Sequence, residues 1–324
     1  MTTDSVYTAH DIPDLFAALP GQLGFVPQES LCVIGTRGPR HRFSFSMRVD
    51  LPEEENIDAL SRFVVAHLER QDCDGAIVLG VSERPELAGK AVWATELALG
   101  EIRPVVSAWA TKDRYWTTFD DCDPDGYAYT ISPHHRAVVQ AVLAGQEILP
   151  DRAALERRYQ PERTERARWV GAAVDAVALQ VAGIVHRAND PGEVGRGVVG
   201  PILQAALIGR TPSTGDLAQL IVWTSCEPVR GFALSLVNTE TAASLLELWA
   251  HVARLAPPEL AVAPLTLAAC SAYLRGDGAQ ALVALERALT TEPRDELANI
   301  VLRLLQDGVP PSVFAGVLQG GVDR

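Results

Sequence analysis

The sequence has few cysteines and too few basic residues to balance its acidic ones. Lys and Arg number 28 against 41 Asp and Glu, so the formal net charge is −13. An acidic surface repels nucleic-acid phosphates and anionic lipid headgroups, and we therefore expect neither kind of binding. The five cysteines are widely spaced and include no C-x-x-C pair, which is typical of reduced thiols in a cytosol.

Targeting and membrane segments are also missing from the pattern. Residues 1–11 carry neither a basic nor an apolar leader region, and the longest apolar stretches are interrupted by Asp175 and Gln180 or by Pro264. We expect no secretory signal, no membrane span and a cytoplasmic location. With 48% hydrophobic and 21% charged residues, the 324-residue chain is typical of a globular protein with room for two domains.

No complete catalytic, metal or cofactor motif is present: G-x-S-x-G, H-E-x-x-H and G-x-x-x-x-G-K-[ST] are all absent. Asp121, Asp123 and Asp125 begin like a calcium loop, but Ser132 stands where a bidentate glutamate is needed. Residues 195–200 match G-x-G-x-x-G but follow a helical pattern rather than a strand, so we interpret them as a flexible interhelical loop. We predict no cofactor and no metal.

The first third of the chain indicates an α/β domain. Asp11 and Pro13 favour a helix start, and the helix is expected to end near Pro20. The apolar run 31–34 and the alternating stretch 43–51 predict a β-hairpin. Further patterns predict helices and strands in alternation, which implies a mixed sheet with β-hairpins and crossover helices. The expected helices are 53–70 and 85–99, and the expected strands are 76–81, 104–110 and 114–119.

The remainder predicts an all-α domain, and we place the domains at 1–130 and 131–324. Helix 162–187 is apolar nearly all round and is expected to be central and buried. The last helices carry the small, aromatic and proline positions of one tetratricopeptide unit. One unit cannot form a solenoid, so we expect a tetratricopeptide-like hairpin that caps the domain. The other expected helices are 198–208, 214–223, 240–255, 264–274, 279–290 and 294–306.

Five polar residues at predicted strand ends or on the polar strand face form the candidate binding site. They are Ser30, Arg48, Asp50, Asp113 and Arg114. An Arg and an Asp two positions apart on a strand share a face, where they can bind an anionic or amide group or pair with each other. We favour the structural pair. The catalytic residues are unknown, because no histidine can be placed beside Ser30.

Several stretches together resemble a known family. LGFVPQESLCVIG, MRVDLP, DRYW, the Cys-x-Pro-x-Gly of 122–126 and YLRGDGAQALVALERALTTEP are similar to the actinobacterial domain-of-unknown-function family 4192. The resemblance spans about 15–311, and its pattern includes Ser30, Arg48, Asp50, Arg114 and Gly126. Arg230-Gly231 departs from it, since relatives carry Arg-Asp there. The resemblance implies no activity.

Two functional hypotheses remain. The first is a non-catalytic cytosolic binding or adaptor protein that contacts a protein partner through its C-terminal helices. The second is a small-molecule-binding protein or hydrolase with a site on the N-terminal hairpin, where Ser30, Arg48, Asp50 and Arg114 would hold the ligand. The sequence does not decide between enzyme and binding protein.

Overall fold

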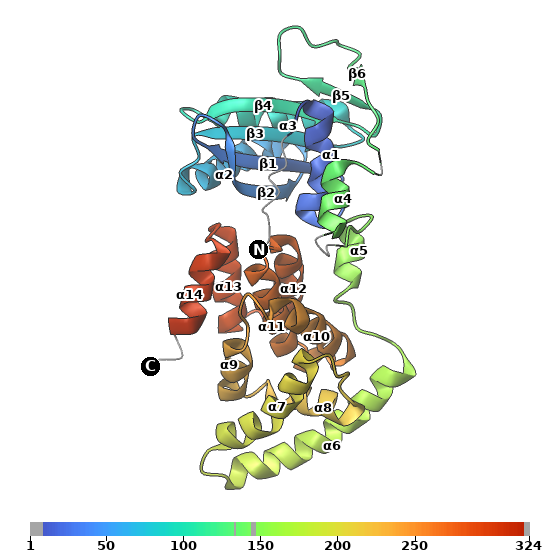
Figure 1. Ribbon diagram of the computed structural model, residues 1–324, viewed down its shortest axis with the longest axis vertical. Coiled ribbons are helices and arrows are strands. Elements are labelled where there is room, and N and C mark those ends of the chain that lie inside the picture. Colours follow the sequence, from blue (N-terminus) through green and yellow to red (C-terminus); the bar gives the residue numbers. More distant parts are fainter. Residues whose placement is uncertain (1–8, 133, 144–146, 321–324) are drawn as a thin grey trace. The chain divides into compact units, whose positions relative to one another are not determined.

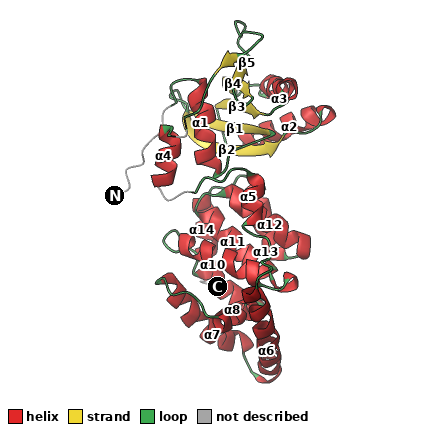
Figure 2. Ribbon diagram, turned by 90° about the vertical axis from the view of Figure 1, so that its right-hand side faces the viewer, coloured by secondary structure: helices red, strands yellow, loops and turns green. Residues whose placement is uncertain are grey.

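The computed structural model describes residues 9–132, 134–143 and 147–320 and divides into two compact units, residues 1–152 and 153–324. The first unit is α/β and the second is all-helical (Figures 1 and 2). The predicted fold class, an α/β domain followed by an α-helical one, is therefore confirmed. Helix α4 (Arg136–Leu143), which lies beyond the predicted boundary at 130, packs against α1 (Ile12–Leu23) of the first unit.

The first unit is built on one six-stranded sheet with the strand order β2-β1-β3-β4-β5-β6. Only β3 and β4 pair in parallel, and the other neighbours are antiparallel. The two predicted hairpins, β1-β2 and β4-β5, are confirmed. The strands are β1 (Ser30–Arg37), β2 (Arg42–Asp50), β3 (Gly75–Val81), β4 (Arg103–Ala110), β5 (Arg114–Thr117) and β6 (Tyr127–Ala128).

Helices cover both faces of this sheet (Figure 2). Successive side chains of a strand point to opposite faces, so Leu31 and Val33 pack beneath α2 (Ile57–Arg70) and α3 (Pro85–Ala98). Cys32 and Leu79 belong to the opposite face, where Phe16 and Leu19 of α1 cover them. A short 3-10 turn (Glu54–Asn56) precedes α2.

Helix α1 begins as predicted. Asp11 is its N-cap, and the Asp11 carboxylate accepts a hydrogen bond from the backbone N–H of Asp14. The helix does not stop at Pro20 but continues to Leu23, and Gly24 ends it with a φ of 74°. The stop signal lies at the glycine rather than at the proline.

The second unit packs around α11 (Val262–Leu274), in which all thirteen residues are buried. α10 (Ala242–Leu255) and α12 (Gly278–Thr291) pack against it, and α11 and α12 form the predicted helical hairpin. The Asp277 side chain caps α12 by accepting from the backbone N–H of Gln280. The other helices are α5 (Arg152–Arg157), α6 (Glu165–Arg187), α7 (Pro191–Leu207), α8 (Thr214–Trp223), α9 (Glu227–Ser235), α13 (Glu296–Gln306) and α14 (Pro311–Gly320), with a 3-10 turn at Pro258–Leu260.

The prediction that 162–187 forms a central buried helix is wrong. α6 buries only Val170, Val174 and Val177, and its principal neighbour is α8. By length and apolar composition alone, α6 is long enough and apolar enough to cross a membrane. Only 22% of its most apolar window is buried, which a central helix would not show. Among the described helices it alone meets this criterion for a membrane span. The sequence pattern predicts no span here, because Asp175 and Gln180 interrupt the apolar stretch. The central position belongs to α11.

Candidate functional site

Ser30, Arg48 and Asp50 meet where β1 begins and β2 ends, because Ser30 pairs with Asp50 in the strand register. The Arg48 Nε donates to Ser30 Oγ at 2.8 Å, and an Arg48 terminal nitrogen lies 2.6 Å from an Asp50 carboxylate oxygen. The guanidinium also lies 5.9 Å from the centre of the Phe25 ring. Only 8% of the Arg48 side chain is exposed, against 72% for Asp50.

In this arrangement the Ser30 hydroxyl and the Arg48 guanidinium, which a catalytic site would need, are already bonded to other groups of the chain. Ser30 is fully buried, and its hydroxyl donates to the carbonyl of Gln28 at 2.6 Å while accepting from Arg48. Within the described part of the chain, no histidine nitrogen lies within hydrogen-bonding distance of the Ser30 hydroxyl. A serine without a neighbouring base is a poor nucleophile. The geometry is that of a structural clamp between the two strands, with its exposed end at Asp50.

Beside this clamp, Glu29 fastens the start of α3 to the sheet. Its φ is 43°, and its carboxylate accepts from the Ser82 hydroxyl, the Glu83 backbone N–H and the Arg84 guanidinium. Partial burial acts to raise the pKa of Glu29, but these donors outweigh it and the pKa lies below its ordinary value. A carboxylate of this chain thus holds the segment 82–84, which leads into α3, against the start of β1.

Asp113 and Arg114 do not join the other three candidates. Three strands lie between β5 and β2, so four inter-strand spacings of about 4.8 Å place the two strands roughly 19 Å apart. Arg114 also belongs to the sheet face that α3 covers, two residues from Trp116, whereas Arg48 pairs with Cys32 of the α1 face. The five predicted site residues therefore lie at two separate places.

Arg114 instead braces the loop that follows β5. One of its terminal nitrogens donates to the carbonyls of Asp125 and Gly126 at 2.7 and 3.0 Å. The indole nitrogen of Trp116 donates to the carbonyl of Pro124 at 3.1 Å. The backbone N–H of Asp125 donates to the Asp123 carboxylate, so this carboxylate serves the turn. DRYW (113–116) and the Cys-x-Pro-x-Gly segment (122–126), which are separate motifs in the sequence, form one structural piece.

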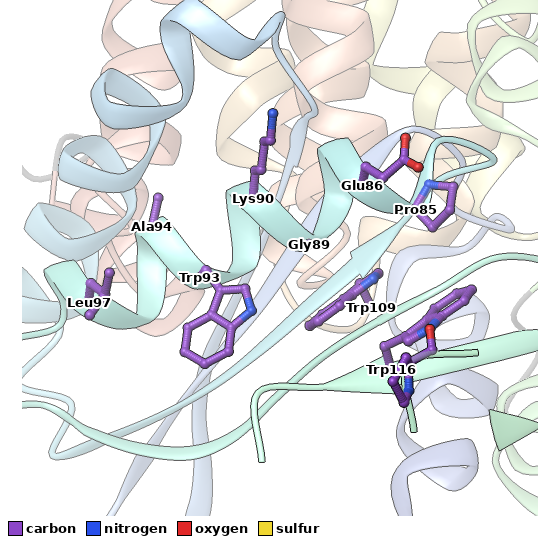
Figure 3. A pocket seen from close by; sticks show the side chains of 10 residues that line it. Pro85, Glu86, Gly89, Lys90, Trp93, Ala94, Leu97, Trp109 and Trp116 are labelled. Atoms are coloured by element: carbon purple, nitrogen blue, oxygen red, sulfur yellow. The ribbon is translucent and has the colours of Figure 1, made fainter. Parts of the chain in front are cut away.

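An apolar groove of about 580 Å3 lies between this piece and α3 (Figure 3). Trp109 and Trp116, which are direct cross-strand partners, stack with their ring centres 6.3 Å apart. Trp93 and Leu97 project from α3 beside them and are 42% and 79% exposed. We call this feature the tryptophan groove; it is lined by Pro85, Glu86, Gly89, Lys90, Trp93, Ala94, Leu97, Trp109, Trp116 and Pro124.

Two glycines make room for the indole rings. A Cβ on Gly89 would lie 3.0 Å from the Trp109 ring, and one on Gly126 would lie 2.5 Å from the Trp116 ring. Gly126 also has a φ of 71°, a conformation that side-chain-bearing residues rarely adopt. The groove therefore depends on Gly126, a residue of the family motif pattern, because it has no side chain.

Sequence reasoning missed the groove. In the sequence Trp116 stands out only as part of the DRYW motif, and no pattern distinguishes Trp93 or Trp109. A usable signal existed, since Trp109 and Trp116 lie at nearly equal distances from the short gap between the predicted strands 104–110 and 114–119, as near cross-strand partners of a hairpin do. The position of α3 above that pair was not deducible from periodicity.

The G-x-G-x-x-G match lies inside a helix, not in a loop. Gly195 and Gly200 are buried within α7. A Cβ on Gly195 would lie 2.4 Å from Val229 and 2.6 Å from Trp223, so this glycine permits close helix packing. The prediction of a flexible interhelical loop is wrong. No group of three or more metal-ligating side chains is found in the described residues.

The model of one protein family, described as a domain of unknown function (DUF4192), matches residues 13–312, nearly the whole chain. This confirms the family that the motifs indicate. No curated protein matches the chain, and no solved structure does.

Proposed function

The chain belongs to the DUF4192 family, whose description assigns no activity. We propose that it is a non-catalytic cytosolic binding or adaptor protein that contacts a protein partner through its C-terminal helices. The observation that carries this proposal is the outward face of α6. An amphipathic helix normally turns its apolar side inward, but α6 keeps much of its apolar surface outside.

Five of the exposed apolar residues of α6 recur every three or four positions and so share one face of the helix. They are Trp169, Ala172, Ala176, Leu179 and Ala182. Trp169 and Leu179 are 64% and 79% exposed. Large exposed apolar patches mark interaction surfaces, and the alanines between the two large residues allow a close approach by a partner's backbone. This face fits the apolar side of a partner helix.

The cysteines support the cytosolic part of the proposal. All five are free thiols, and Cys32, Cys73 and Cys270 are buried. Burial raises the pKa of Cys32 and of Cys270 to about 12, so both remain protonated and unreactive at neutral pH. Unpaired thiols of this kind are typical of a reducing compartment.

The proposal is tested by affinity capture from the native cytosol with the parent protein and two matched variants. Leu179→Asp places a charge on the α6 face, and Ile208→Asp places one at an equally exposed apolar residue (79%) after α7. We expect proteins that the parent and Ile208→Asp both retain to be lost with Leu179→Asp. Recovery of no specific protein by the folded parent would refute the adaptor role, and retention unaffected by Leu179→Asp would refute the α6 surface. Retention on lipid vesicles that Leu179→Asp abolishes would instead identify the face as membrane-binding.

A further inference from the structure

We propose that the tryptophan groove of the first unit binds a proline-containing, basic segment of a partner protein in the polyproline II conformation. This surface is separate from α6 and belongs to the other unit. Three properties of the groove carry the inference: its length and composition, its free hydrogen-bond donors and its charge.

The length and composition of the groove suit an extended peptide. Pro85 and Leu97 mark its extent along α3, and twelve residues at 1.5 Å each give about 18 Å. Polyproline II rises 3.1 Å per residue, so about six residues span this distance. Aromatic-lined grooves are the usual docking sites of proline-rich segments, because prolyl rings pack on indole faces. Here Trp93, Trp109 and Trp116 supply those faces.

The hydrogen-bond donors distinguish this ligand from a helix. Within the described residues, the indole nitrogens of Trp93 and Trp109 have no acceptor, whereas that of Trp116 donates to the Pro124 carbonyl. A polyproline II segment makes no internal hydrogen bonds and presents its carbonyls outward, but a helix uses its carbonyls internally. Pro124 shows the mode of contact, because a carbonyl of a proline-containing loop already receives an indole N–H of the groove.

The charge of the groove favours a basic ligand. Lys90 is neutralised by Glu54, whose carboxylate lies 2.6 Å from the ammonium. Glu86 lines the groove with no ion-pair partner among the described residues, and the whole chain carries a formal charge of −13. An arginine beside the prolines would pair with Glu86, and the general field would attract it.

The test uses indole N–H resonances, since the six tryptophans give six such signals that Trp→Phe variants assign. The probe is the peptide (Arg-Pro-Pro)3, and its control is the peptide in which every proline is alanine. At about 1 mM probe, enough to half-saturate a site with a Kd of 1 mM, we expect the signals of Trp93 and Trp109 to shift. The signal of Trp116, which keeps its Pro124 acceptor, should move less.

Two variants and a control complete the experiment. Trp93→Ala should weaken peptide binding at least about tenfold, as loss of a central aromatic contact does, and Glu86→Gln should weaken it about two- to fivefold in low salt. Ile208→Ala, which removes an exposed apolar side chain of the second unit outside the α6 face, should leave binding unchanged. The proposal is overturned if neither groove signal shifts, if the alanine peptide shifts them equally, or if Trp93→Ala binds like the parent while remaining folded.

Discussion

The Arg48–Asp50 pair allows a sharp test because its two members differ in burial. Breaking a buried ion pair by removing one partner costs about 3–5 kcal/mol, whereas an exposed pair contributes about 0–1 kcal/mol. In this pair the guanidinium side is 8% exposed and the carboxylate side is 72% exposed. The cost of removing a partner therefore depends on which partner remains.

Removal of the carboxylate leaves the buried charge behind. In Asp50→Ala, Arg48 keeps only neutral acceptors, the Ser30 hydroxyl and the Gln28 carbonyl. Because water already screens Asp50, we expect a loss of about 1–2 kcal/mol in unfolding free energy rather than the full buried value.

Removal of the guanidinium leaves Asp50 in water. Arg48→Met fills similar space, and its sulfur can contact the Phe25 ring, so we expect a loss of about 1 kcal/mol or less.

The double variant isolates the interaction. In the Arg48→Met background, Asp50→Ala should cost about 0 kcal/mol, which gives a coupling energy of about 1–2 kcal/mol. Native-state hydrogen exchange of the amides of Leu31 and Val33 in β1, which lies between β2 and β3, reports the unfolding of the first unit separately from that of the second. An Asp50→Ala cost that is equal in both backgrounds would refute the argument, and so would a cost in the parent below about 0.5 kcal/mol.

Three further outcomes follow from the same contacts. Gly126→Ala meets both a φ of 71° and the Trp116 ring 2.5 Å away, and should destabilise the first unit by about 2–4 kcal/mol in denaturant unfolding. Arg230→Ala removes the partner, at 2.6 Å, of an Asp295 side chain that is only 9% exposed; it should destabilise the second unit by about 3 kcal/mol in the same assay. Burial and two nearby arginines lower the pKa of His251, so the unfolded chain binds more protons than the folded one. Stability should therefore fall as the pH drops below about 6.5, and His251→Gln should reduce the fall in thermal midpoint between about pH 7.5 and 5.5.

Local signals were sufficient for most element positions. The predicted helix 214–223 has the bounds of α8, because Ser213 and Asp216 form a capping box at its start. The alternating stretch 43–51 gives β2 because Phe45, Met47 and Val49 pack beneath the helices of one sheet face. In both cases the decisive interaction lies within a few residues or between neighbouring strands.

The burial of α6 and α11 shows the limit of such signals, because the sequence pattern predicts α6 as the central buried helix and the structure has α11 there. Both helices are rich in alanine and in aliphatic residues, and neither shows a clear polar face. Burial depends on how many other helices lie around each one, and periodicity within a helix carries no information about that. α11 packs against several helices, whereas α6 packs principally against α8.

Only one part of the candidate site, the group formed by Ser30, Arg48 and Asp50, could be predicted from the sequence, and again because its contacts are local. Arg48 and Asp50 share a strand, and Ser30 faces them in the adjoining strand of the hairpin, so their meeting follows from local register. Arg114 was grouped with them because it too lies at a strand end. The order of strands in the sheet, which the sequence does not encode locally, places β1, β3 and β4 between β2 and β5.

An adaptor needs at least two surfaces that work independently, and the two proposed surfaces lie on different units. The tryptophan groove is formed entirely by residues of 85–124, and the exposed face of α6 lies within 165–187. Sites that share no residues and no partners contribute additively to free energies. Trp93→Ala should therefore leave capture through α6 intact, and Leu179→Asp should leave peptide binding intact. A single catalytic site assembled from both units would instead lose its activity with either change, so this pair of variants separates an adaptor from an enzyme.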